Sequence, residues 1–308
     1  MEILILHPGA LGDIILSLPA VALLRNKFPS ARITLAGNID HLASIASGYA
    51  ESVVSLSTLP LHLLYSSNPL PEAEVRFWKS FDRIVSWTGA GNPEFTKNFR
   101  EIHPNVCIAS WRPMPGETRH VSQMFVDSLE SAVPLGTKAA PARIFLETKL
   151  REEAKQWLIA HGWNGNDRLT ALHPGAGSRA KRWPLARFIE LGRHLVFQEK
   201  RKLLVIEGPA EPGLVKEITR ALPESAAIAI ESMKLNLLAA VISHCDAFIG
   251  NDSGIAHLAA ALGIRSVVLF GPTQPQHWAP LGRHVTVLQN ADFSLAKITA
   301  EDVTKNLR

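Results

Sequence analysis

Short, continuous apolar runs alternate with helical stretches along this 308-residue chain. In the first half they are EILILH at residues 2–7, RITLAG at 32–37, RIVSW at 83–87 and VCIAS at 106–110. A run without polar alternation is typical of a strand that is covered on both faces, and strands that alternate with helices favour parallel sheets. The sequence therefore predicts an α/β protein.

The second half repeats this pattern after a charged helix expected over 148–160. The expected strands there are LTALH, KLLVIEG, AAIAI, DAFIGN and SVVLFG, at 169–173, 202–208, 226–230, 246–251 and 266–271. Further helices are expected over 13–27, with a kink or break at Pro19, over 183–197 and over 298–308. The tetrapeptide HPGA directly follows the first strand of each half, at 7–10 and 173–176. This recurrence, in a chain too long for one comfortable core, predicts two Rossmann-like domains at 1–160 and 161–308.

Charge and cysteine content argue against several classes of protein. The 32 basic and 28 acidic side chains leave a net charge of +4, and no basic block is interleaved with aromatic residues, so no nucleic-acid partner is expected. Cys107 and Cys245 cannot form a disulfide framework or a zinc site, which favours a reducing, cytoplasmic compartment. No uncharged apolar stretch reaches the roughly 18–20 residues of a membrane span, so we expect a soluble or peripherally attached protein.

The segment HPGALGD follows the first expected strand and contains Gly9, Gly12 and Asp13. Parallel sheets bind ligands at the carboxyl ends of their strands, where glycines let the backbone approach a ligand. Two interpretations of Asp13 are open. It could cap the following helix, or it could act as a general base, which requires burial or a close partner to adjust its basicity.

Two segments of the second half have features of a phosphate site. HPGAGSRAKRWP, at 173–184, places Gly177 and Ser178 in a compact turn just before Lys181 and two arginines. Backbone N–H groups and positive charge would meet a phosphate there, although the Gly-Lys-Ser/Thr ending of a P-loop is missing. GNDSGIAHLAAALG, at 250–263, ends a strand and opens a helix, so Asp252 or Ser253 is expected to cap that helix. His257 in its first turn is either structural or a ligand of a diphosphate.

No Asp-x-Asp sequence occurs in the chain. Transferases that neutralise a leaving diphosphate with a divalent metal commonly use that pair of carboxylates. Without it, helix N-termini and cations must meet the charge. We therefore expect neither a metal site nor a cofactor.

Taken together, the blocks PGALGDIILSLPA, HPGAGSRAKRWP and NDSGIAHLAAALG resemble glycosyltransferase family 9, which includes the lipopolysaccharide heptosyltransferases. Their order and spacing match across nearly the whole chain. The resemblance implies a GT-B fold, in which two Rossmann-like domains face each other across a cleft, with the acceptor on the N-terminal domain and the donor on the C-terminal one. It also implies metal-independent, inverting transfer from a nucleotide-diphosphate sugar, with ADP-heptose as the best-known donor.

The same resemblance assigns roles to individual residues. Asp13 is similar to the family's catalytic base, and Lys181 to a residue that contacts the donor phosphates. Glu211, in EGPAE, matches a carboxylate that is directed at the nucleotide ribose. The family's Asp-Ser/Thr-Gly-x-x-His block, which holds the diphosphate and the donor sugar, is matched by Asp252, Ser253, Gly254 and His257.

The acceptor half departs from the family pattern, because the segment 56–119 is shorter than in the best-known heptosyltransferases. Arg112, Arg119 and His120 are candidates for holding an acidic or phosphorylated acceptor, and solvated loop residues are the alternative. Gly9 and Gly12 complete the expected acceptor side. The implied acceptor is a glycan or glycolipid such as the lipopolysaccharide core, at the cytoplasmic face of the inner membrane.

Two other functions are compatible with the same residues. One is a sugar-nucleotide epimerase or hydrolase of the same two-domain architecture. The other is a non-catalytic nucleotide-binding protein, although the presence of both Asp13 and the 252–257 block favours an enzyme. A dehydrogenase is less favoured, because neither half has an intact Gly-x-Gly-x-x-Gly after its first strand.

Overall fold

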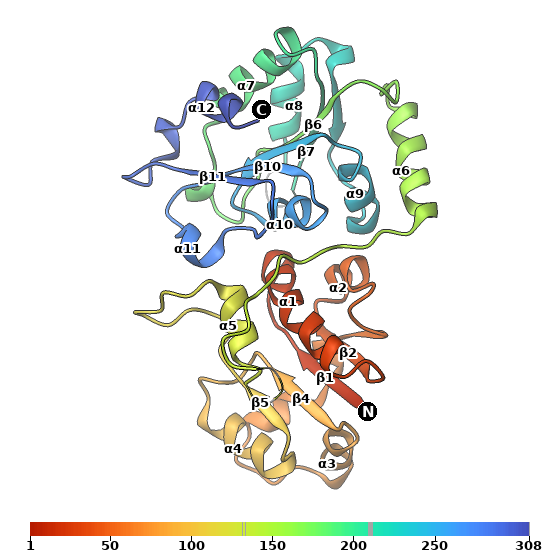
Figure 1. Ribbon diagram of the computed structural model, residues 1–308, viewed down its shortest axis with the longest axis vertical. Coiled ribbons are helices and arrows are strands. Elements are labelled where there is room, and N and C mark those ends of the chain that lie inside the picture. Colours follow the sequence, from red (N-terminus) through yellow and green to blue (C-terminus); the bar gives the residue numbers. More distant parts are fainter. Residues whose placement is uncertain (131, 133, 209–211, 308) are drawn as a thin grey trace. The chain divides into compact units, whose positions relative to one another are not determined.

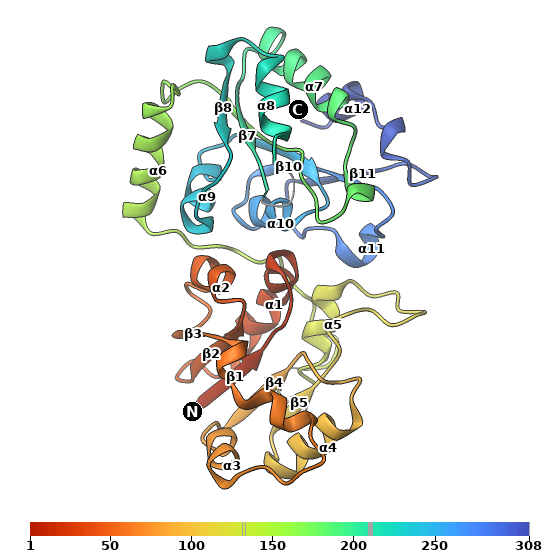
Figure 2. The ribbon, with the colours of Figure 1, turned by 180° about the vertical axis from the view of Figure 1, so that it is seen from behind.

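The computed structural model describes residues 1–130, 132, 134–208 and 212–307. The chain forms two compact units, Met1–Ala142 and Arg143–Arg308, each built on a parallel sheet (Figure 1). The boundary expected from the sequence lies after residue 160, so the two divisions differ by the segment that contains the helix α6 (Thr148–Ala160). Helix α6 packs against α9 (Leu235–Ile242) and lies beside it in both views (Figures 1 and 2), which is why it belongs to the second unit.

The strands described in the first unit form one sheet in the order β3-β2-β1-β4-β5, and all neighbours are parallel. Their bounds are β1 (Glu2–Leu6), β2 (Arg32–Gly37), β3 (Ser52–Ser55), β4 (Arg83–Ser86) and β5 (Val106–Ile108). The sequence predicted each of them except β3. Strand β1 lies at the centre, so the turn that follows it opens in the middle of the sheet's carboxyl edge.

The helices of the first unit cover both faces of this sheet. They are α1 (Leu11–Lys27), α2 (Ile39–Ile45), α3 (Glu72–Lys79), α4 (Pro93–Ile102) and α5 (Val121–Asp127), with short 3₁₀ turns at Leu56–Thr58 and Pro60–Tyr65. Leu4 and Leu6 of β1 share a core with Trp78 and Phe99 of α3 and α4. Because side chains alternate along a strand, the intervening residues of β1 face the other side, where α5 packs against α1. Helix α1 runs without a break through Pro19, at the cost of one backbone hydrogen bond.

The strands described in the second unit form a parallel sheet in the order β11-β10-β9-β6-β7-β8. Their bounds are β6 (Leu169–His173), β7 (Lys202–Ile206), β8 (Ala227–Ile230), β9 (Ala247–Asn251), β10 (Arg265–Phe270) and β11 (Val285–Gln289). All but β11 were predicted. The order turns at β6 and β9, which are adjacent in the sheet although β7 and β8 lie between them in sequence. A turn of this kind is where parallel sheets bind ligands.

The remaining helices of the second unit are α7 (Leu185–Phe197), α8 (Leu214–Arg220), α10 (Gly254–Ala261), α11 (Pro275–Trp278) and α12 (Ala300–Lys305), with 3₁₀ turns at Arg179–Lys181, Glu224–Ala226 and Leu295–Lys297. Phe188 and Leu191 of α7, Ile218 of α8 and Val303 of α12 belong to one buried cluster with residues of β6, β7, β9 and β10. The five core positions of β9 are all buried, as the continuous apolar run predicted.

Candidate functional site

In the first unit, the turn after β1 holds Asp13 at the start of α1. Ala10 is the N-cap of this helix, and its backbone N–H donates to Oδ2 of Asp13 over 2.9 Å. A carboxylate in the first turn is also favoured by the helix dipole. Asp13 thus makes the contact expected of a capping residue, and its side chain remains partly exposed. Gly12 lies beside it in the same turn and is half-buried.

Gly9 is held between two side chains of this turn. A Cβ atom at Gly9 would lie 2.5 Å from Cβ of Asp13 and 2.5 Å from Cε1 of His7, distances that real Cβ atoms essentially never show. The backbone N–H of Gly9 donates to Nδ1 of His7 over 3.0 Å. A glycine is therefore required here by close packing on both sides.

His7 directly follows β1 and is 2% exposed. Its ring lies among aromatic side chains, with centroid distances of 5.3 Å to Phe125, 5.7 Å to Trp87 and 6.3 Å to Trp111. Burial lowers the pKa of His7 from 6.5 to about 3, against smaller raising effects of the backbone of His7 and Asp13. The imidazole is therefore neutral at physiological pH. His7 is not among the site residues predicted from the sequence, because one histidine at the end of a strand carries no distinctive signal.

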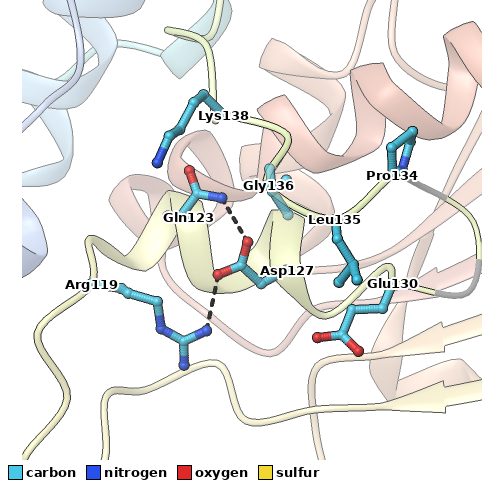
Figure 3. A pocket seen from close by; sticks show the side chains of 9 residues that line it. Arg119, Gln123, Asp127, Glu130, Pro134, Leu135, Gly136 and Lys138 are labelled. Atoms are coloured by element: carbon cyan, nitrogen blue, oxygen red, sulfur yellow. Dashed lines mark hydrogen bonds and ion pairs between the residues drawn. The ribbon is translucent and has the colours of Figure 1, made fainter.

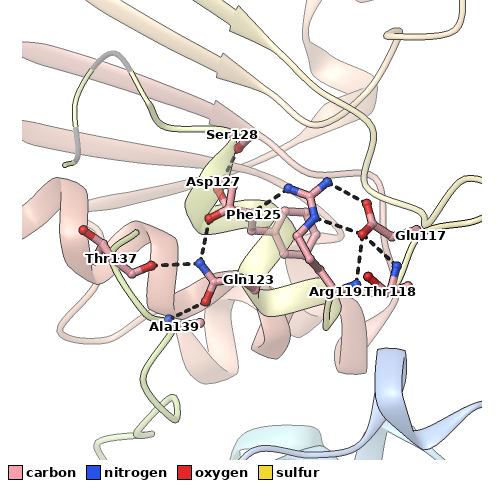
Figure 4. A network of polar contacts seen from close by, with 9 residues as sticks. All are labelled: Glu117, Thr118, Arg119, Gln123, Phe125, Asp127, Ser128, Thr137 and Ala139. Carbon is pink, nitrogen blue, oxygen red and sulfur yellow. Dashed lines mark hydrogen bonds and ion pairs between the residues drawn. The ribbon is translucent and has the colours of Figure 1, made fainter. Parts of the chain in front are cut away.

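The acceptor candidates Arg119 and His120 lie at the start of α5. Arg119 donates to Glu117 over 2.6 Å and to Asp127 over 2.9 Å, as Figure 4 shows. Hydrogen bonds from Arg119 lower the pKa of Glu117 from 4.5 to about 2, and those to Glu117 and Asp127 raise the pKa of Arg119. His120 is the N-cap of α5, and its Nδ1 accepts the backbone N–H of Ser122. Both candidates thus have structural contacts.

A cavity of about 330 Å³ opens beside this network (Figure 3). It is lined by Arg119, Gln123, Val126, Asp127, Glu130, Pro134, Leu135, Gly136 and Lys138. The lining carries two basic and two acidic side chains, so its charge alone does not favour an anion. Gln123 joins the two walls of the cavity, because its amide donates to Asp127 and to the backbone carbonyl of Thr137.

In the second unit, the buried side chain of Asn251 joins the loops after β6 and β9. Its Oδ1 accepts the backbone N–H of Trp183 over 2.9 Å, and its Nδ2 donates to the carbonyl of Pro174 over 2.8 Å. The residue is 0% exposed. These bonds hold the ends of the 174–183 loop against the beginning of the 252–257 block. Asn251 is not among the predicted site residues, although its position at the end of a strand, directly before Asp252, could have indicated it.

Lys181 and Asp252 meet where these two loops adjoin. Nζ of Lys181 lies 2.8 Å from Oδ2 of Asp252, and the side chain of Asp252 is 7% exposed while that of Lys181 is 32% exposed. Residues that are 71 positions apart in sequence and were predicted in separate segments are thus brought into contact. A largely buried carboxylate holds an ammonium group whose other side reaches solvent.

Except for Glu211, the remaining donor candidates lie within a few residues of Lys181 or Asp252 in the sequence. Ser253 is the N-cap of α10, and its hydroxyl accepts the N–H of Ala256, which confirms a predicted cap. Gly254 begins the helix and is half-buried, whereas His257 in its first turn is buried. Gly177 and Ser178 are exposed on the loop that leads to Lys181. Glu211 lies outside the described residues.

Gly177 differs from Gly9 in its surroundings. A Cβ atom at Gly177 would have no described atom within 4 Å, and its φ is not in the left-handed region. Neither packing nor backbone conformation within the described part of the chain therefore requires a glycine at this position.

The described residues contain neither a metal-binding cluster nor a membrane-spanning helix. They contain no cluster of three or more His, Cys, Asp or Glu side chains that could hold a metal ion. None of the helices in the described part of the chain is both long enough and apolar enough to cross a membrane.

The known proteins that this chain resembles include several heptosyltransferases. A lipooligosaccharide heptosyltransferase 2 from Haemophilus influenzae is 36% identical over 134 residues, which are 42% of this chain and 38% of that protein. The chain thus matches well under half the length of this relative. Among solved structures, an Escherichia coli ADP-heptose lipopolysaccharide heptosyltransferase II has a TM-score of 0.77 at 20% identity, over 100% of this chain and 97% of that one.

A glycosyltransferase family 9 protein from Veillonella parvula has a TM-score of 0.81 at 21% identity, and the match covers 99% of this chain and 95% of that one. At these identities the two solved structures show a shared fold. The model of glycosyltransferase family 9 (heptosyltransferase) matches residues 116–307, which is more than half of the chain. The expected family and the expected fold class are thereby confirmed, and the chain belongs to glycosyltransferase family 9.

Proposed function

We propose that this protein is a heptosyltransferase that moves heptose from ADP-heptose onto an acceptor of the lipopolysaccharide core. Membership of glycosyltransferase family 9 supports the transferase activity. The names of the relatives, one a lipooligosaccharide heptosyltransferase and one an ADP-heptose lipopolysaccharide heptosyltransferase, support the donor and the acceptor class. The lipid-linked acceptor puts the reaction at the cytoplasmic face of the inner membrane, with the enzyme attached peripherally.

The donor diphosphate binds to the second unit, at Lys181 and the N-terminus of α10. The single observation that carries this assignment is the ion pair of Lys181 with the nearly buried Asp252. It fixes the ammonium group beside the first turn of a helix, whose N–H groups and dipole attract anions. An ammonium group has three N–H donors, so the contact with Asp252 leaves donors for phosphate oxygens.

Gly177 and Ser178 supply the other wall of the donor site. The described fold gives no steric reason for a glycine at position 177. Close approach of a ligand to the backbone is the remaining reason, since a side chain there would occupy the space of the phosphate. Glu211 is proposed to bind the nucleotide ribose, and Ser253, Gly254 and His257 to hold the diphosphate and the sugar.

The acceptor is activated by Asp13 of the first unit, with Gly9 and Gly12 beside it. Asp13 takes the proton of an acceptor hydroxyl, and the oxygen forms a bond to the anomeric carbon of the donor. The bond from that carbon to the diphosphate breaks, ADP leaves from the opposite face, and the anomeric configuration is inverted. Arg119 and His120 are proposed to face the acceptor, with Arg119 exchanging part of its contact with Glu117 for an acidic group.

The leaving diphosphate is stabilised by the protein alone in this proposal. The absence of an Asp-x-Asp pair from the sequence supports this, because that pair is the common metal-binding device of sugar-nucleotide transferases. Lys181 and the amide groups at the start of α10 then balance the charge that develops on ADP. Fixed donors of this kind cost no reorganisation during the reaction.

The experiment that tests the proposal is incubation of ADP-heptose with the protein, with and without a lipopolysaccharide core acceptor that lacks heptose. Mass spectrometry should find a glycan heavier by one heptose only when acceptor is present, and the anomeric coupling in its NMR spectrum should show inversion. Conversion of ADP-heptose without acceptor would instead identify an epimerase or a hydrolase. No conversion under either condition would favour a nucleotide-binding protein without catalytic activity.

A further inference from the structure

The turn between β1 and α1 contains a buried histidine whose polar atoms are used unequally. Nδ1 of His7 accepts the N–H of Gly9 over 3.0 Å, so the proton of the neutral ring is on Nε2. Nε2 is buried and makes no hydrogen bond to any described residue. A buried N–H group without a partner costs on the order of 1–3 kcal/mol. An apolar ring would avoid that cost among these aromatic neighbours. The hydrogen bond that Nδ1 accepts from Gly9 is therefore the reason for a histidine at this position.

The position of the His7 ring is itself fixed. Trp87 meets it edge to face at 5.7 Å, and Phe125 of α5 lies at 5.3 Å. Trp87 is anchored in turn by a hydrogen bond of 3.0 Å from its Nε1 to Oγ of Ser128. The ring is therefore held from the side of β4 and α5, independently of the turn that it contacts.

From the ring, contacts lead directly to Asp13. Gly9 lies between His7 and Asp13 so closely that a Cβ atom would be 2.5 Å from each side chain. The next amide, that of Ala10, donates to Oδ2 of Asp13. Two successive N–H groups of one turn thus bind the histidine and the aspartate. Displacing the first would displace the second, and with it the carboxylate.

We propose that His7 is a positioning residue, which holds Asp13 in its reactive place by accepting the N–H of Gly9. This inference rests on the proposed function, in which Asp13 is the base. The low pKa of His7 supports it, because the acceptor nitrogen stays unprotonated throughout the physiological range. His7 acts through the turn and does not contact the substrate.

The test compares two substitutions of His7 in the 308-residue chain. His7→Phe keeps an aromatic ring of similar size and removes the acceptor. His7→Asn keeps an acceptor, since Oδ1 of asparagine stands as many bonds from the backbone as Nδ1 and readily binds the N–H two residues on. We expect kcat to fall about tenfold to a hundredfold in His7→Phe with the KM for ADP-heptose unchanged, because small misplacement of a reacting group has effects of this size. His7→Asn should recover most of kcat.

The chain offers a matched control in His103. It is 3% exposed, and its Nδ1 accepts the N–H of Asn105, also two residues on, at 3.2 Å. It precedes β5, so it lies at the amino ends of the parallel strands, whereas the Asp13 turn lies at their carboxyl ends. His103→Phe should lower stability and leave kcat unchanged. Turnover at the wild-type rate in His7→Phe, or equally poor turnover in His7→Asn, would overturn the positioning role.

Amide hydrogen exchange at Gly9 separates this inference from the proposed function. Exchange should be slow in the wild-type protein and in His7→Asn, and at least about tenfold faster in His7→Phe, because an amide without its partner opens more readily. If Asp13→Ala transferred heptose at the normal rate, the proposed function would fail, and Gly9 exchange would still show whether His7 holds the turn. Unchanged exchange in His7→Phe would refute that role by itself.

Discussion

Acidification from pH 7 to pH 5 should destabilise the first unit through His7. Burial lowers the pKa of this residue to about 3 in the folded protein, whereas the unfolded chain has the ordinary value of 6.5. Between these two values the unfolded state binds a proton that the folded state does not. The free energy of unfolding therefore falls as the pH drops below about 6.5, and the loss is complete near pH 3. Between pH 7 and pH 5 this linkage amounts to about 2 kcal/mol.

Urea unfolding of the 308-residue chain at the two pH values, followed by circular dichroism, measures this effect. The wild-type transition that belongs to the first unit should lose about 2 kcal/mol more between pH 7 and pH 5 than the same transition in His7→Phe. The subtraction cancels other groups, including His41, whose pKa burial also lowers. The range from pH 7 to pH 5 stays above 4.5, the ordinary pKa of Glu51 and Glu117. Hydrogen bonds from arginine lower the pKa of both carboxyl groups, so their contribution to stability is lost at more acidic pH.

A direct titration checks the same reasoning without unfolding. In protein labelled with ¹³C in its histidine rings, the resonance that is absent from His7→Phe belongs to His7. It should not shift between pH 8 and pH 5. A resonance of His7 that titrates near pH 6.5, or an equal pH dependence of stability in the two proteins, would refute the account of a buried neutral ring.

Two further substitutions test the packing of each site. Gly9→Ala should lower the rate of transfer at least about tenfold with ADP affinity unchanged, because the added Cβ forces His7 and Asp13 apart. Gly91→Ala is the control, since a Cβ there would have no described atom within 4 Å. A normal kcat in Gly9→Ala would contradict the prediction. Asn251→Leu should destabilise the second unit by about 2–5 kcal/mol in urea unfolding, since two buried backbone groups lose their partner. A loss below about 1 kcal/mol would show that these bonds contribute little.

Of the four edge strands in the described sheets, β3 and β11 were not predicted from the sequence, whereas β5 and β8 were. Strand β3 is a short SVVS segment, and the strand β11 is VTVLQ; every residue in both is half-buried. Edge strands are covered less completely than central ones, so their apolar runs are shorter or interrupted by polar residues. The central strands β1, β6 and β9 are buried almost throughout and were predicted from their composition alone.

The parts of the site that depend on contacts within one segment were predictable from the sequence, and those that depend on contacts between distant segments were not. Caps at Asp13 and Ser253 follow from a residue type at the start of a helix. The contact between Lys181 and Asp252 joins two loops, and only the adjacency of β6 and β9 brings those loops together. The role of His7 depends on a hydrogen bond within a turn and on aromatic residues from distant segments, so its residue type alone gave no indication.

The central claim is that the second unit binds the donor through Lys181 while Asp13 of the first unit provides the base. Its most direct test measures ADP affinity by calorimetry and heptose transfer by mass spectrometry in four variants. Lys181→Met has Lys305→Met as its surface control, and Asp13→Ala has Asp302→Ala. Lys305→Met also breaks a 2.8 Å ion pair, with Glu301. Asp302→Ala removes a cap of the same kind, in which Oδ2 accepts the N–H of Thr299 over 2.9 Å.

We predict that Lys181→Met weakens ADP binding about tenfold to a hundredfold, as loss of a charge-assisted hydrogen bond implies. Asp13→Ala should bind ADP normally and lose roughly 10²- to 10⁴-fold in transfer rate, which is the usual contribution of a general base. The two surface controls should match the wild-type protein in both assays. Normal transfer by Asp13→Ala, or normal ADP affinity in Lys181→Met, would contradict the account.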